Sequence, residues 1–200
     1  MTQDPVDGLM QVLPRFEGNI PFMYQDTAGL VTVGIGHMIP NLHWAQQIPF
    51  VARSDGSPAT ADQIAADFQT VAAAPKGQAM PAYQRITSLI LPENWAVADA
   101  AERLRNEYLP ALKTQYPEYD GYPQSAQHAL LDMIYNLGSG GLAKFLRLKA
   151  AVQAGHWQAA AQACHRAGIQ QARNGWTAEQ FSVAQAFRPV PVPAGEKEQA

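Results

Sequence analysis

The chain has 200 residues, of which 47% are hydrophobic, a formal net charge of −3 and a single cysteine, Cys164. This size allows one sizeable hydrophobic core, and a single cysteine excludes an intramolecular disulfide. The mild acidity and the lack of a Lys/Arg cluster argue against nucleic-acid binding. No apolar run reaches the roughly 20 residues that a bilayer span requires, so we expect no stable membrane insertion.

The amino terminus predicts a helix that ends at a carboxylate. Residues 1–7 carry acids where a secretory signal peptide has basic residues and an apolar block, so we expect cytoplasmic synthesis without a signal peptide. Gly18 is a natural helix stop, which places Glu17 at the helix end. Apolar side chains recur at helical spacing before it, at Val6, Leu9, Met10, Leu13 and Phe16.

A β-hairpin is predicted next, with a second carboxylate at its tip. Residues 22–24 and 30–35 read as short strands, and the loop Asp26-Thr-Ala-Gly29 between them has turn chemistry at both ends. Gly34 and Gly36 leave the second strand without side chains at alternate positions. Another backbone or a ligand can therefore approach closely, as at the floor of a substrate groove.

The middle of the chain predicts mixed structure. Residues 38–49 look irregular, and residues 50–58 read as a strand or loop closed by a turn. Thr60 is a candidate N-cap for a helix that ends near Pro75. A long alanine-rich helix begins at Trp95.

The carboxy-terminal half predicts a set of helices. Pro110 bends or ends the long helix, and residues 116–122 form an aromatic connector. Ser125 caps the next helix, which stops at Gly138. Further helices are expected at residues 142–154, 156–167 and 177–187, and the tail, residues 189–200, should be disordered.

Two stretches resemble the phage-type lysozymes, the endolysins of glycoside hydrolase family 24. The first comprises Glu17-Gly18, Tyr24-Gln-Asp26-Thr-x-Gly29 and Thr32-Val-Gly-Ile-Gly-His37, and the second is Ala129-Leu-Leu-Asp-Met-Ile-Tyr-Asn-Leu-Gly138. The resemblance implies a peptidoglycan hydrolase that cuts the β-1,4 bond between N-acetylmuramic acid and N-acetylglucosamine. It also implies a mainly helical α+β, two-lobed lysozyme-like fold, with a small antiparallel β-hairpin lobe, a long bridging helix and a helical carboxy-terminal lobe.

The same resemblance sets the expected domain limits, with one lysozyme-like domain over residues 1–188. Its expected parts are an amino-terminal lobe over 15–92, a bridging helix over 93–113 and a helical lobe over 114–188. The family is shorter after its histidine, so residues 40–88 contain an insertion. That insertion is a lip on the cleft, a docking surface for a delivery partner, or structural elaboration.

The resemblance assigns catalytic roles to three residues. Glu17 is the general acid, Asp26 is the carboxylate that directs the attacking water, and Thr32 is a polar neighbour in the same cleft. Glycoside hydrolysis needs a proton on the leaving oxygen and an ionised partner beside the sugar. The family is inverting, which predicts carboxyl groups about 6.5–9.5 Å apart. No cofactor and no metal are expected.

Three further residues are candidates for substrate binding. For His37 a structural hydrogen bond is the better interpretation, because the other histidines form no metal-ligand pattern with it. Tyr135 occupies a position where the family has an aromatic residue near the sugar. Arg173 falls where the family has a basic, positively charged residue that pairs with the catalytic glutamate. The alternative is that Arg173 is an ordinary surface arginine. Ala163 replaces a polar sugar-contacting residue of the family.

Two other activities stay open, a lytic transglycosylase acting on the same bond and a non-catalytic peptidoglycan-binding module. Asp26 and Thr32 argue against the transglycosylase, and the intact acids at positions 17 and 26 argue against the binding module. The expected partners are peptidoglycan glycan strands and the machinery that delivers the protein to the periplasm, either a phage holin or a contractile secretion machine. The acidic charge and the insertion favour an interbacterial effector, which would need an immunity protein.

Overall fold

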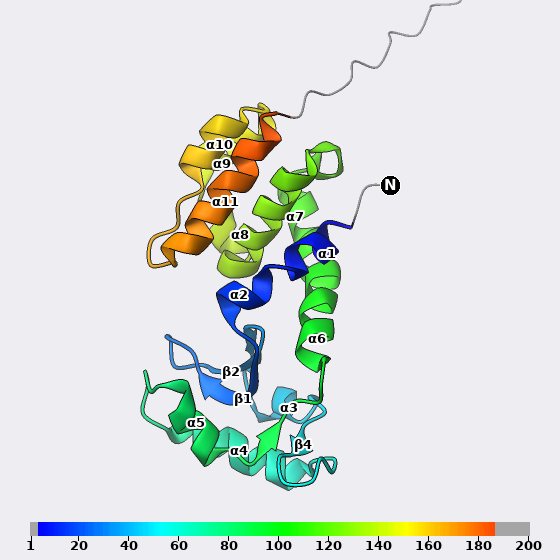
Figure 1. Ribbon diagram of the computed structural model, residues 1–200, viewed down its shortest axis with the longest axis vertical. Helices are drawn as coiled ribbons and strands as arrows, with labels where there is room; N and C mark the ends of the chain where they lie inside the picture. The colour runs from blue at the N-terminus through cyan, green and yellow to red at the C-terminus, as the bar shows by residue number, and fades with distance from the viewer. Residues whose placement is uncertain (1–3, 187–200) are drawn as a thin grey trace, which may run out of the picture. The chain divides into compact units, whose positions relative to one another are not determined.

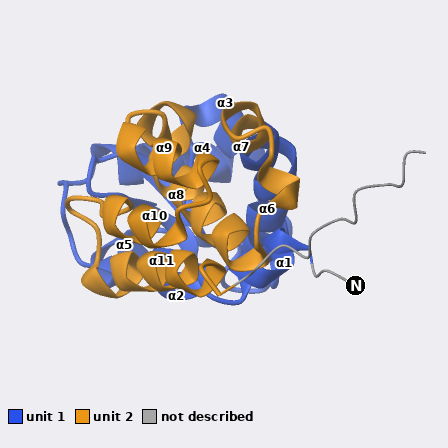
Figure 2. Cartoon of the chain, turned by 90° about the horizontal axis from the view of Figure 1, so that it is seen from above, with its two compact units in different colours: residues 1, 3–110 blue, residues 2, 111–200 orange. Residues whose placement is uncertain are grey.

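The computed structural model describes residues 4–186, and the predicted disordered tail lies outside them. The described chain is mainly helical with small antiparallel sheets (Figure 1), which confirms the α+β class. It divides into two compact units, the first ending at Pro110 and the second beginning at Ala111 (Figure 2). The domain limits drawn from the sequence stay a prediction.

The first unit begins with two short helices where the sequence predicts one. Helix α1 spans Pro5–Met10 and helix α2 spans Leu13–Glu17. Pro14 cannot lie inside a longer helix, because it lacks an N–H group and clashes with the preceding turn. Gly18 ends α2 with a φ of 77° and donates its N–H to the Pro14 carbonyl at 3.0 Å. Glu17 is therefore the last helical residue, as expected.

The predicted hairpin is present and gains a third strand. Strands β1 (Ile20–Gln25), β2 (Val31–Gly34) and β3 (His37–Met38) form an antiparallel sheet in the order β1-β2-β3. The register places Tyr24 directly opposite Thr32. Side chains directly opposite each other lie on the same face of a sheet. The hairpin thus sets these two side chains side by side.

Gly34 allows a helix, rather than a ligand, to approach the sheet. Its φ is 64°, and a Cβ atom there would lie 3.0 Å from the Cβ of Ala96, near the start of helix α6 (Trp95–Arg103). Side chains other than glycine rarely adopt such a φ. Of the two interpretations that the sequence offers, the structure shows the close backbone approach at this position.

The segment between β3 and α6 is more regular than predicted. The expected irregular stretch, residues 38–49, contains a helix, and a further helix and strand were not anticipated. Thr60 forms a capping box with Gln63, as its type and spacing favour. Strands β4 (Val51–Ala52) and β5 (Leu89–Ile90) pair antiparallel, and helices α4 (Ala61–Ala73) and α5 (Met80–Ile86) pack on β1 (Figure 1). The helix within residues 38–49 is α3 (Leu42–Ala45).

The helix that begins with α6 does not end at Pro110. A π-helical turn, Leu104–Tyr108, follows α6 and leads directly into α7 (Leu109–Gln115). In this turn the Leu109 N–H bonds the Leu104 carbonyl, one residue further back than in an α-helix. The wider turn ends two residues before Pro110. The ring of a proline and its missing N–H group disturb a regular helix.

The second unit is helical throughout its regular structure. Helix α8 (Gln124–Leu142) packs against α11 (Gln171–Ala184), and α10 (Trp157–Ala163) packs against both α9 (Leu146–Gln153) and α11. Gly138 has a non-helical φ of 67° and breaks α8 where the sequence predicts a stop, but helix resumes after it. A 3₁₀ turn (Tyr119–Gly121) lies between α7 and α8.

Candidate active site

The negative charges of the two candidate catalytic carboxylates both raise the pKa of one hydroxyl group. Burial, together with the negative charges of Glu17 and Asp26, raises the pKa of Tyr24 to about 12. One of these carboxylates ends helix α2 and the other follows strand β1, and the charge of each favours the protonated form of the same hydroxyl group. Both acidic residues are partly exposed.

Asp26 is fixed by the turn that it starts. Its Oδ1 accepts the N–H groups of Ala28 at 2.9 Å and Leu30 at 2.8 Å. Its own carbonyl accepts the N–H of Gly29 at 3.0 Å, and Gly29 has a φ of 84°. Within residues 4–186 no hydrogen bond engages Oδ2 of Asp26. One carboxylate oxygen thus orients the group, and the other is left for a water or a ligand.

Thr32 lies beside Tyr24 but uses its hydroxyl locally. Its side chain is 3% exposed, and Oγ1 donates to the Leu30 carbonyl at 3.0 Å. The Leu30 carbonyl also accepts the N–H of Asp26 at 3.0 Å. Thr32 therefore bonds to the same end of the hairpin that carries Asp26.

His37 makes the structural hydrogen bond that the sequence favours. Its Nδ1 lies 2.9 Å from Oδ2 of Asp99, and its ring is 5.8 Å from the Trp95 ring. Asp99 also accepts from Nε of Arg103 at 2.9 Å, and Nη2 of Arg103 donates to the Ile35 carbonyl at 3.0 Å. This network ties α6 to the sheet.

The Asp99 carboxylate makes stability dependent on pH in the acid range. Burial alone would raise the pKa of Asp99, but the hydrogen bond from His37 and the charge of Arg103 outweigh it and hold the pKa below the ordinary value of 3.8. A lowered folded-state pKa contributes stability that is present above the unfolded value and is lost as pH falls through the folded value. We expect the Tm advantage of the wild type over Asp99→Asn to shrink as pH drops below 3.8. Circular dichroism melts over a pH series measure it, and parallel Tm losses in both proteins would contradict it.

Arg173 is buried in the second unit, so the surface-arginine alternative is wrong. It is 3% exposed, and its Nε and Nη2 both lie 2.9 Å from Oδ1 of Asp132. Arg166 approaches the other oxygen of Asp132 at 2.9 Å, and Thr177 donates to the same oxygen at 2.9 Å. A buried carboxylate needs such partners to offset its lost hydration. Asp132 therefore fixes the position of Arg173.

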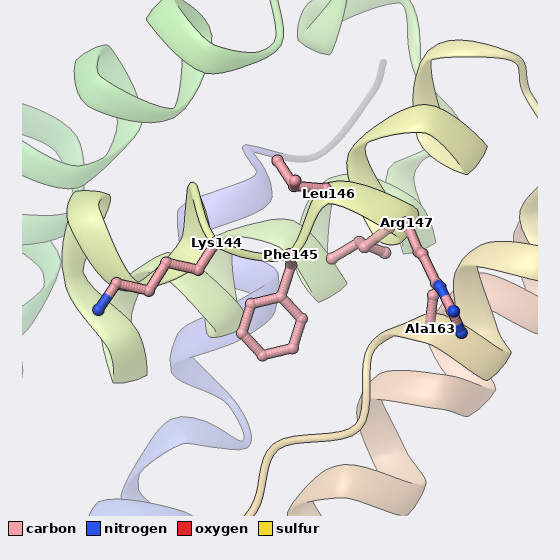
Figure 3. A pocket seen from close by; sticks show the side chains of 6 residues that line it. Lys144, Phe145, Leu146, Arg147 and Ala163 are labelled. Carbon is pink, nitrogen blue, oxygen red and sulfur yellow. The ribbon is translucent and has the colours of Figure 1, made fainter.

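Tyr135 and Ala163 also belong to the second unit. Tyr135 is 7% exposed on α8, one turn beyond Asp132. Ala163 lines a pocket of about 350 Å³ in the same unit (Figure 3). In this pocket the Phe145 ring and Leu146 supply apolar surface, and the Arg147 guanidinium ends beside Ala163. The polar group that the resemblance implies at position 163 is thus absent, and a cation stands next to that position.

Sequence reasoning missed the partners of the candidate residues. Asp99 gives no local signal, because it is an ordinary acid on a helix and lies 62 positions from His37. Asp132 does give one, because a carboxylate inside the apolar run Ala129-Leu-Leu-Asp-Met-Ile must find a buried partner. The motif includes Tyr24, but its residue type and position indicate no role for its hydroxyl group.

A mainly helical α+β fold, with one acid ending a helix and another in the hairpin turn that follows, defines a lysozyme-like protein. The family model described as phage lysozyme matches residues 14–175, so the chain belongs to the phage lysozyme family. As a member it is a glycosidase of the lysozyme type that acts on peptidoglycan. No curated protein matches the chain.

Over residues 4–186, none of the helices combines the length and the apolar character that crossing a bilayer requires. Over the same residues, no three histidine, cysteine or acidic side chains gather closely enough to hold a metal ion.

Proposed function

We propose that the chain hydrolyses the β-1,4 bond between N-acetylmuramic acid and N-acetylglucosamine, with Glu17 as general acid and Asp26 as the carboxylate that activates water. The main support for the proposal is the match to the phage lysozyme family over residues 14–175, a range that contains both acids. Paired carboxylates beside one sugar are the minimum that acid/base glycoside hydrolysis requires.

The mechanism follows from the roles of the two acids. Glu17 donates its proton to the leaving oxygen, and the ionised Asp26 accepts a proton from the attacking water and stabilises the developing positive charge of the sugar. The turn supports this role for Asp26, because the N–H groups of Ala28 and Leu30 bind Oδ1 and so fix the direction of Oδ2. Thr32 supports the same hairpin end. Tyr135 and Arg173 stay candidates for substrate binding in this proposal.

A turbidity assay on purified peptidoglycan tests the activity. We expect the protein to clear the suspension and to release muropeptides with ordinary reducing ends, identified by mass spectrometry. Products with anhydro ends would mean a lytic transglycosylase, which uses one acid and no water. Binding to the wall without clearing would mean a non-catalytic peptidoglycan-binding module. Either result would overturn the proposal.

The biological setting is a separate proposal. We infer an interbacterial effector with a cognate immunity protein, supported by the mild acidity of the chain and by the segment over residues 40–88. The alternative is an endolysin released by a phage holin. The genes on either side separate the two, because an immunity gene or holin and tail genes would lie there.

A further inference from the structure

The end of helix α4 is tied to strand β1 immediately before Asp26. Gln25 is 4% exposed, and its Nε2 lies 2.7 Å from the Val71 carbonyl, 3.3 Å from that of Ala72 and 3.0 Å from that of Ala74. The first two carbonyls belong to the last turn of α4 and the third to its C-cap. The end of a helix presents carbonyl groups without intrahelical partners, and this one is bound by a side-chain amide.

A second contact joins the same segment to the Asp26 turn. Lys76 lies just beyond α4, and its Nζ donates to the Ala28 carbonyl at 3.4 Å. The Lys76 stem covers Gly29, since a Cβ atom there would stand 2.5 Å from Cε of Lys76. The turn that holds Asp26 is thus contacted from residues 71–76 at two places.

Gln25 acts here as a hydrogen-bond donor. In the part of the chain that the structure describes, its Oε1 is buried without a hydrogen-bond partner, whereas Nε2 faces three carbonyls. A buried acceptor left unpaired costs free energy, which the contacts of Nε2 must offset. A side chain with several hydrogen-bond donors could therefore replace the Gln25 amide and keep the bonds to the α4 carbonyls, whereas an apolar side chain would lose them.

Gln25 is the last residue of β1, and Asp26 follows it directly as the first residue of the turn. We propose that Gln25 is a positioning residue, through which the end of α4 fixes the backbone that carries Asp26. The inference rests on the proposed role of Asp26. It also gives part of the segment over residues 40–88 a purpose, since α4 lies within it.

The experiment compares two substitutions at position 25 by initial rates over a range of peptidoglycan concentrations. Gln25→Met keeps the length of the side chain and removes the donors. We expect kcat to fall by about tenfold with KM little changed, because a small displacement of a catalytic group is costly. Gln25→Lys supplies three donors and a positive charge, which suits a helix carboxyl end, and we expect it to restore kcat to within about twofold.

Asp67→Asn is the matched control for lost stability. Asp67 is buried on the same helix, but its carboxylate accepts the N–H groups of Ser88 and Leu89, and within residues 4–186 none of its hydrogen bonds goes to the Asp26 turn. We expect this variant to melt at a lower temperature with an unchanged kcat well below its Tm. A kcat loss that follows Tm equally in Gln25→Met and Asp67→Asn would reduce Gln25 to a structural role and overturn the inference.

Lys76→Ala tests the second contact without risk to the fold, because Lys76 is exposed. We expect a kcat loss smaller than that of Gln25→Met. Wild-type rates in both variants, with an inactive Asp26→Asn, would overturn the inference and leave the proposed function standing. An active Asp26→Asn would instead overturn the proposed function.

Discussion

The Glu17→Gln variant is expected to lose turnover while keeping its fold. Glutamine has the shape of the protonated acid but cannot give a proton to the leaving oxygen. General acid catalysis contributes about 10²–10⁴-fold, so we expect the rate of peptidoglycan clearing to fall by at least about a hundredfold. The α2 end is closed by Gly18 rather than by the Glu17 side chain, which is why the fold should persist. Initial clearing rates and the Tm measure the two effects.

The matched control for this variant is Glu102→Gln. Glu102 is exposed on α6 of the same unit, and its substitution removes the same charge. We expect wild-type clearing from the control. Near-normal clearing by Glu17→Gln would remove Glu17 from the role of proton donor.

The Asp26→Asn variant is expected to be comparably inactive, for a different reason. The asparagine oxygen can still accept the N–H groups of Ala28 and Leu30, so the turn is retained. Only the negative charge is lost, and with it the group that takes a proton from water. We expect the clearing rate to fall about 10²–10⁴-fold with little change in Tm.

Asp55→Asn provides a control with the same local chemistry. Asp55 is an exposed aspartate of the first unit, and its Oδ1 accepts the N–H of Ser57 at 3.0 Å in a similar turn. This substitution should leave clearing unchanged. If Asp55→Asn and Asp26→Asn lowered the rate equally, the effect at position 26 could not be assigned to catalysis.

The local features of the site could be predicted from the sequence because they depend on short-range chemistry. Gly18 ends α2 at Glu17 because glycine adopts a positive φ at little cost. Asp26 and Gly29 define the hairpin turn, and Thr60 caps α4, through bonds that span four residues or fewer. Residue type and spacing carry all the information that these features need.

The long-range partners could not be predicted, because nothing near a residue reveals what folds against it. Gly34 predicts the close approach of a backbone or a ligand without deciding between them, and Ala96 of α6 occupies the space beside it. The sequence predicts that the last helix starts at Thr177, but α11 begins at Gln171 and the Thr177 hydroxyl donates to Asp132 instead of capping. A polar residue that bonds a distant buried carboxylate resembles a helix cap when only its neighbours are known.

The most direct test of whether Glu17 donates a proton and Asp26 activates water is hydrolysis in water enriched in ¹⁸O. Mass spectrometry detects the label in the products, and NMR gives the configuration of the new reducing ends. We expect one ¹⁸O atom at each new reducing end. Each new end should first appear as the α anomer, because an inverting enzyme reverses the β configuration of the bond. Reducing ends of retained β configuration, or anhydro ends that carry no label, would contradict this expectation.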